Sequence, residues 1–215
     1  MQTPHNLIFL GWGMDVNSIP PVLRMPDSTY FYNYAEEIPF SPDPNALYNV
    51  YAWSFGVYIA PILINQWGIS SQIVSATAIN GTCLPVDDTF GIPVSIAQGT
   101  LDNLSEASRQ KFNIRMFSSR SEYAENQQYS SERNVESLRK ELSFFITHAL
   151  SANEKIAMNK GDGIDQPMGS EYNLYTLAII GTQDRIFPPQ NQLTFWQSQG
   201  IEVRQLEMGH WPTKI

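Results

Sequence analysis

The sequence predicts an α/β fold with a mostly parallel central sheet and a helical insertion. Short apolar runs typical of buried strands alternate with segments of helical periodicity, the order expected for parallel strands joined by helices. Residues 102–158 contain neither glycine nor proline and show helical spacing, which predicts the insertion. The composition, 42% hydrophobic and 16% charged over 215 residues, suits one packed domain.

The first half of the chain begins the sheet. Residues 28–40 are rich in aromatic side chains but are interrupted by proline, so their structure stays ambiguous. An apolar helix is expected over residues 55–67, and the glycines and prolines of residues 81–93 predict a long departure from the sheet. Three apolar runs predict buried strands, namely residues 7–10, 48–53 and 71–80.

The second half begins with the insertion and then returns to the sheet. We expect a single domain over residues 1–215, with a helical insertion of three or so helices at about 84–170. A strand ending near Gly181, a helix over residues 190–199 and a strand over residues 201–207 follow. Because ligands bind beyond the carboxyl ends of parallel strands, residues that directly follow the strands are candidates for a site.

Charge and cysteine content exclude several classes of protein. A net charge of -8 argues against nucleic-acid binding, which needs a positive field to displace counterions from phosphate. The single cysteine, Cys83, rules out an internal disulfide and favours a reducing compartment. The sequence shows no zinc-type Cys/His spacing, no leader-like start and no apolar run near the ~20 residues that span a bilayer. We therefore expect a cytoplasmic protein that is not membrane-bound.

Ser54 lies where a predicted strand meets a predicted helix, and it is the candidate nucleophile. A serine on such a strained turn needs small flanking residues, usually in the pattern Gly-x-Ser-x-Gly. Here Ala52 and Gly56 flank it, and the extra methyl group of alanine makes the motif less specific. The structural alternative is a small residue at a strand-to-helix junction.

His210 is the candidate base that accepts the proton of the serine. The chain contains three histidines. His5 precedes the first strand, and His148 belongs to an apolar-patterned helix where a core or surface role fits better. His210 follows the last predicted strand, so it would lie at the same edge of the sheet as Ser54.

Asp184 is the candidate acid that orients the histidine. It follows a strand and precedes His210 by 26 residues, which leaves room for one helix and one strand. Asp87 and Asp88 also follow a strand, and Asp87 is the alternative acid. The chain order serine, acid, histidine is the one found in α/β-hydrolases, which makes that fold the prediction.

Two backbone amides are candidates for an oxyanion hole. One is the amide of Trp12 in the Gly-Trp-Gly loop after the first strand, and the other is that of Phe55, directly after the nucleophile. A glycine turn with a packed tryptophan is the structural alternative for the loop. Cys83 reads as a small buried residue rather than a nucleophile, since no basic residue lies beside it.

Five motifs occur in order along the chain: GWGMD at 11–15, AWSFGV at 52–57, AINGT at 78–82, GIP at 91–93 and GTLDNLSEASRQKFNIRM at 99–116. In this order they resemble the BioG group of pimeloyl-[acyl-carrier-protein] methyl ester esterases. The resemblance covers most of the chain and is far more specific than the serine motif alone. Alanine at position 52 looks usual for that group.

The resemblance implies an α/β-hydrolase core with a helical lid, without metal or organic cofactor. It implies hydrolysis of the methyl ester of a pimeloyl chain on acyl carrier protein, in biotin synthesis. By matching position, Ser54 would be the nucleophile, His210 the base and then acid, and Trp12 and Phe55 the oxyanion donors. Asp184 follows from the general hydrolase pattern. The alternatives are a carboxylesterase or thioesterase for free small esters, and a non-catalytic binding protein.

A carrier-protein partner predicts a basic docking face. Acyl carrier proteins are acidic, so an enzyme of net charge -8 needs a locally positive surface to bind one. Residues 101–160 hold nine of the 13 Lys and Arg against eight of the 21 Asp and Glu. The densest basic run should border the mouth of the substrate tunnel, and it consists of Arg109, Lys111, Arg115 and Arg120.

Overall fold

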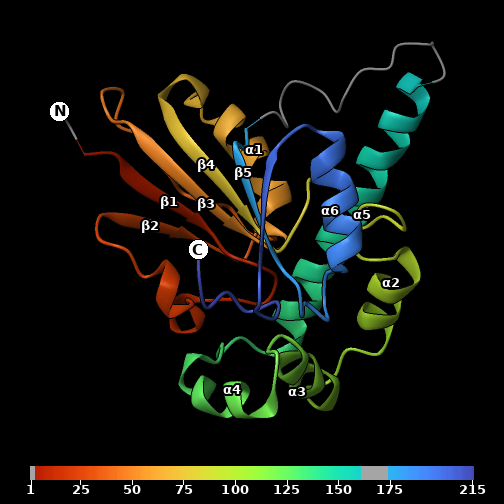
Figure 1. Cartoon of the computed structure of the whole chain (residues 1–215). Helices are drawn as coiled ribbons and strands as arrows, with labels where there is room; N and C mark the ends of the chain where they lie inside the picture. The colour runs from red at the N-terminus through yellow and green to blue at the C-terminus, as the bar shows by residue number, and fades with distance from the viewer. Residues whose placement is uncertain (1–2, 161–173) are drawn as a thin grey trace.

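The computed structural model describes residues 3–160 and 174–215 (Figure 1). Within these residues six strands form one sheet in the order β2-β1-β3-β4-β5-β6, and each neighbouring pair is parallel. The strands are β1 (His5–Phe9), β2 (Ser28–Phe31), β3 (Tyr48–Trp53), β4 (Ile73–Ile79), β5 (Leu177–Gly181) and β6 (Glu202–Leu206).

Helices connect the strands and cover the sheet. Helix α1 packs on β1 and β3, and α6 packs on β5 and β6. Leu7, Ile8 and Ile180 are fully buried, as expected for central strands of a parallel sheet with both faces covered. The helices are α1 (Gly56–Gln66), α2 (Val94–Asp102), α3 (Glu106–Arg115), α4 (Arg120–Glu125), α5 (Val135–Lys160) and α6 (Pro189–Ser198). Short 3-10 turns are η1 (Val16–Ser18), η2 (Pro21–Leu23), η3 (Ser70–Gln72) and η4 (Gln127–Tyr129).

Helices α2 to α5, here called the insertion helices, separate β4 from β5 in the chain. Helices α3 and α4 lie beside the end of the sheet at which the strand arrows point, and the long α5 rises from there along the molecule (Figure 1). The last part of the predicted insertion, residues 161–170, lies outside the described residues. Among residues 3–160 and 174–215, none of the helices has the length and apolarity that a membrane crossing requires.

Two elements differ in extent from the sequence expectation. Of the ambiguous residues 28–40, Ser28–Phe31 pair with β1 as an edge strand, and the chain leaves the sheet well before Pro39. Helix α2 begins at Val94, directly after Pro93, although helical spacing pointed to a start near residue 102. The helix was not predicted because the glycine at position 99 weakens the helical pattern. In the structure a side chain at that position would point into open space.

Candidate active site

Ser54 lies in the two-residue turn between β3 and α1, in a left-handed backbone conformation with φ of 58°. A non-glycine residue in this region carries about 1–3 kcal/mol of strain, which the surroundings must hold in place. The amide of Ser54 donates to the carbonyl of Ile79 at 2.9 Å, and this bond fixes the turn against the end of β4. The turn directs the hydroxyl beyond the sheet edge.

Crowding around this turn explains which neighbours must be small. A Cβ added at Gly56 would lie 2.4 Å from the carbonyl oxygen of Phe9, and one at Gly81 would lie 2.4 Å from the carbonyl oxygen of Ser54. Both distances are shorter than real side chains allow. Ala52 is fully buried and pairs with Phe9 and Ala78, so the fold accommodates its methyl group. The glycine requirement therefore falls on positions 56 and 81.

His210 joins Ser54 to Asp184, and all three side chains are buried. Its Nε2 lies 2.9 Å from Ser54 Oγ, and its Nδ1 lies 2.8 Å from Asp184 Oδ2. A neutral imidazole with its proton on Nδ1 donates to the aspartate and leaves Nε2 to accept from the hydroxyl. This geometry allows the serine proton to pass to the histidine when Oγ attacks a carbonyl carbon.

The backbone of His210 is held by two residues that sequence reasoning did not select. Trp53 Nε1 donates to the His210 carbonyl at 2.9 Å, and Asn80 Nδ2 donates to the same oxygen at 2.8 Å. Asn80 is fully buried, has a φ of 48°, and accepts from the Gly181 amide through Oδ1. One asparagine thus links the ends of β4 and β5 to the loop that carries the histidine.

Asp184 is oriented through both of its carboxylate oxygens. Oδ1 accepts from the amides of Ile186 and Phe187, at 2.8 and 2.9 Å. Oδ2, which contacts the histidine, also accepts from Gln192 Nε2 at 3.2 Å. Gln192 is fully buried on α6 and is a third residue that sequence reasoning missed. The sequence feature that could have identified Gln192 is a glutamine on the apolar side of a helix, three positions before the buried Phe195.

The alternative acid, Asp87, takes a different role in the structure. Its Oδ1 accepts from the amides of Thr89 and Phe90, both at 2.8 Å, and so closes its own loop. Asp88 accepts from the amide of Val94 at the start of α2. The contact with His210 belongs to Asp184, and the two neighbouring aspartates organise the entry into the insertion helices.

Ser54 and His210 both line one cavity. The predicted oxyanion donors Trp12 and Phe55 both line it, and within the described residues neither of their amides donates a hydrogen bond. Free N–H groups beside a buried serine are what an oxyanion requires. The remaining walls are mostly apolar and include Met14, Phe112, Met116, Leu142 and Ile186.

Residues of α2 and α3 line one side of this cavity. Ile96 of α2 lines it although 53% of its surface is exposed, and Arg115 of α3 lines it while also being exposed. A second cavity is also lined by Trp12 and Phe112, whose rings meet edge to face at 5.0 Å. The lining of the first cavity is therefore suited to an apolar group beside Ser54.

The four predicted basic residues lie in different surroundings. Arg109 donates to the carbonyls of Arg133 and Ser131, so its guanidinium group is already hydrogen-bonded within the protein. It also lines the second cavity. Arg115 stands at the mouth of the first cavity. Lys111 and Arg120 are exposed at the surface of α3 and α4. The structure thus brings only Arg115 of this run to the cavity that holds Ser54.

The other two histidines lie away from Ser54. His5 Nε2 contacts the Thr29 hydroxyl on the neighbouring strand, at 2.9 Å. His148 is exposed on α5, where Nδ1 lies 2.8 Å from the Phe144 carbonyl and the two rings stack at 4.0 Å. Of the three histidines, His210 alone contacts both a buried serine and a buried carboxylate.

We expect Cys83 to resist alkylation in the folded protein. It is 1% exposed, and burial raises the pKa of its thiol well above the ordinary value, so little of the reactive thiolate forms. Iodoacetamide followed by intact-mass measurement should leave the native protein unlabelled and add one adduct in denaturant. Rapid labelling of the native protein would show that the thiol is reactive after all.

Comparison with protein families and solved structures places these features in context. A family model described as pimeloyl-ACP methyl esterase BioG matches residues 2–213. The crystal structure of SeMet-BioG from Haemophilus influenzae superimposes with a TM-score of 0.76 at 27% identity, covering 97% of this chain and 90% of that one.

Two more distant structures confirm the predicted α/β-hydrolase fold. MGS-M2, an alpha/beta hydrolase enzyme from a Medee basin deep-sea metagenome library, has a TM-score of 0.53 at 12% identity and covers 96% of this chain and 82% of that one. Naproxen esterase from Bacillus subtilis has a TM-score of 0.50 at 11% identity and covers 98% and 78%. At these identities the likeness concerns the fold alone.

Two curated relatives align along nearly the whole chain. Malonyl-[acyl-carrier protein] O-methyltransferase of Bacteroides fragilis (strain 638R) is 34% identical over 216 residues, which covers 97% of this chain and 40% of the relative. The chain thus spans less than half the length of that protein. An uncharacterized protein of Haemophilus influenzae is 31% identical over 208 residues, covering 95% of this chain and 87% of the relative.

Proposed function

This chain belongs to the family of the pimeloyl-ACP methyl esterase BioG, and from this we propose that it hydrolyses the methyl ester of a pimeloyl chain carried on acyl carrier protein. The products are methanol and pimeloyl-[acyl-carrier protein], and the reaction ends pimelate assembly in biotin synthesis. The observation that carries the chemistry is the buried contact chain Ser54–His210–Asp184, which opens into an apolar cavity.

The proposed mechanism has two steps that use His210 in turn as base and acid. Ser54 Oγ attacks the ester carbonyl carbon while His210 Nε2 takes its proton, and the amides of Trp12 and Phe55 hold the oxyanion. The tetrahedral intermediate collapses as His210 protonates the leaving methoxide. Water, deprotonated by His210, then attacks the acyl-enzyme, and His210 returns the proton to the departing Ser54 Oγ as the acid product leaves. Asp184 stabilises the imidazolium in both steps.

A relative supplies independent support for the substrate class. The Bacteroides fragilis protein is named as a methyltransferase for a malonyl group on acyl carrier protein, and part of it is similar to this chain. Such a methyltransferase makes a methyl ester of a carrier-bound diacid, and an esterase of the proposed kind removes a methyl ester from a longer carrier-bound diacid. The two reactions are chemically paired.

The insertion helices α2 to α5 are proposed to act as the lid that shapes the substrate cavity. Ile96 and Thr100 of α2 and Arg115 of α3 line the cavity that contains Ser54. The acyl chain would enter between these helices, with its carrier protein docked outside. Arg109 is then the least suited of the four basic residues to bind the carrier protein, because its guanidinium group already donates to two backbone carbonyls.

Charge reversal at Lys111 tests the docking face. Lys111 is exposed on α3, one helical turn before Arg115, which lines the cavity mouth. In Lys111→Glu we expect KM for the carrier-bound methyl ester to rise about fivefold, since one exposed charge contributes ~1 kcal/mol. Salt dependence should weaken, and hydrolysis of p-nitrophenyl acetate should stay unchanged.

The matched control is Arg204→Glu on the edge strand β6, outside the insertion helices. It changes the net charge by the same amount, and Arg204 is an exposed residue paired with Glu202. Equal effects of the two reversals would mean that overall charge, rather than a local face, attracts the carrier. Equal losses on both substrates would mean that the Lys111 variant damages the fold.

A further inference from the structure

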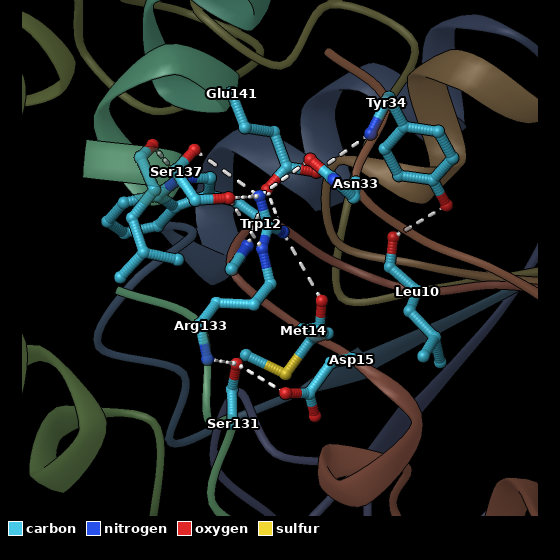
Figure 2. Close-up of polar contacts among 12 residues, drawn as sticks. Leu10, Trp12, Met14, Asp15, Asn33, Tyr34, Ser131, Arg133, Ser137 and Glu141 are labelled. Carbon is cyan, nitrogen blue, oxygen red and sulfur yellow. Dashed lines mark hydrogen bonds and ion pairs between the residues drawn. The ribbon is translucent and has the colours of Figure 1, made fainter. Parts of the chain in front are cut away.

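An ion pair between Arg133, which lies just before α5, and Glu141 of α5 is found behind the loop that carries Trp12 (Figure 2). Glu141 is 0% exposed, and its Oε2 lies 2.6 Å from Arg133 Nη1. The same Oε2 accepts from the Gly13 amide, while Oε1 accepts from the Tyr34 amide, each at 3.0 Å. Burial raises the pKa of the Glu141 carboxyl, and Arg133 and the two amides oppose that rise.

Three consecutive residues of this loop are hydrogen-bonded either to α5 or to Arg133, which lies just before that helix. Trp12 Nε1 donates to the Leu138 carbonyl at 2.8 Å, and the next amide, of Gly13, donates to Glu141. The carbonyl of Met14 then accepts from Arg133 Nη1. Figure 2 shows Arg133 and Glu141 beside the loop that carries Trp12 and Met14.

These hydrogen bonds fix the backbone conformation on the carboxyl side of Trp12. The Gly13 amide belongs to the peptide plane that follows Trp12, and Gly13 has a φ of 78°, in the left-handed region. With the indole and the following peptide plane both anchored, rotation about the Trp12 backbone is restricted, and the direction of its own amide is set. Arg133 is itself held by Asn33 Oδ1 at 2.7 Å.

A buried ion pair of this kind contributes little to the free energy of unfolding. Desolvating two charges opposes folding, and a buried pair can often be replaced by apolar residues without loss of stability. Glu141 interrupts an otherwise apolar stripe formed by Leu138, Leu142 and Phe145. The contacts with backbone amides and carbonyls are what apolar residues could not reproduce.

We propose that Arg133 and Glu141 are positioning residues, which aim the Trp12 amide at the oxyanion by holding the loop from Trp12 to Met14. The inference rests on the proposed function, in which Trp12 supplies one of the two oxyanion donors. Neither side chain lines the cavity that contains Ser54. Their effect should therefore appear in kcat, because the amide matters most when charge develops on the carbonyl oxygen.

The first test replaces the pair by apolar residues of similar size, Arg133→Met/Glu141→Leu. We expect the protein to stay folded with a lower thermal unfolding midpoint, because the Gly13 and Tyr34 amides lose their acceptor. We also expect kcat on p-nitrophenyl acetate to fall about 10- to 100-fold, with KM within about threefold. A boronic acid, which forms a tetrahedral adduct with a catalytic serine, should bind more weakly by the same factor as kcat. Wild-type kcat and boronate affinity in this variant would overturn the proposal.

A second variant keeps the test decisive should the double variant not fold. Glu141→Asp preserves the charge beside Arg133 but withdraws the carboxylate from the Gly13 amide, and kcat should fall about 10-fold with KM retained. The control is Glu136→Asp, on the exposed face of the same helix, which should behave as wild type. A folded Glu141→Asp protein with wild-type kcat would contradict the positioning role.

Both measurements are independent of the natural substrate. If the wild type hydrolyses p-nitrophenyl acetate but not the carrier-bound methyl ester, the proposed function fails, and the variants still decide the positioning role. If the wild type hydrolyses both esters and the variants match it in kcat and boronate affinity, the positioning role fails alone.

Discussion

Ser54→Ala and His210→Ala should each lower kcat on the carrier-bound methyl ester by about 10⁶-fold, while the protein stays folded. Ser54 Oγ and His210 Nε2 lie 2.9 Å apart inside the protein, so removal of either leaves no nucleophile or no base. Because the two groups act as a unit, the double variant should be no slower than either single one. Initial rates, with circular dichroism as the folding control, check this result.

A small residual activity would be informative. If either variant retained more than about a tenth of the wild-type activity, the missing group would contribute less than ~1.4 kcal/mol to the barrier, too little for a nucleophile or base. In that case the role of that residue would have to be reassigned. A fluorophosphonate probe gives a second readout, since labelling of the wild type should vanish in Ser54→Ala.

Asp184→Asn should lower kcat by about 10⁴-fold, whereas Asp87→Asn should change it less than about twofold. Asp184 Oδ2 lies 2.8 Å from His210 Nδ1, and an amide there favours the wrong tautomer of the imidazole. Asp87 instead holds the amides of Thr89 and Phe90, a local task that an asparagine oxygen can share. The measurement is kcat for both variants at the same pH.

The opposite order of the two kcat values would assign the role of catalytic acid to Asp87. If Asp87→Asn were the slower variant, the catalytic carboxylate would have to reach His210 from the β4 side, in a conformation different from this structure. Equal and small effects would mean that His210 is oriented chiefly through its backbone, by Trp53 and Asn80.

The sheet and the position of the site were predictable because they depend on local patterns. Apolar runs predicted β1, β3, β4 and β5 in order, and the residue after each strand faces the same edge. Ser54 and Asp184 were candidates for that reason, and His210 was selected by elimination among three histidines. The structure brings these three side chains into contact.

The residues that support the site were not predictable, because their partners are distant in sequence. Asn80 contacts residues 181, 209 and 210, and Glu141 contacts residues 13 and 34. No local pattern encodes such pairs. Glu141 did leave a signal, since it interrupts the apolar stripe of α5, and a buried charge must have a partner. Among the basic residues, Arg109 differs from the exposed Lys111 because it donates to the carbonyls of Arg133 and Ser131.

The most direct test of the proposed function is the intact mass of methyl pimeloyl-[acyl-carrier protein] after incubation with the wild type and with Ser54→Ala. We predict that the wild type removes one CH₂ unit from the carrier and releases methanol, with the pimeloyl group still attached, and that Ser54→Ala leaves the mass unchanged. Loss of the whole acyl group would instead identify a thioesterase. An unchanged mass with a wild-type enzyme that hydrolyses p-nitrophenyl acetate would contradict the proposed substrate.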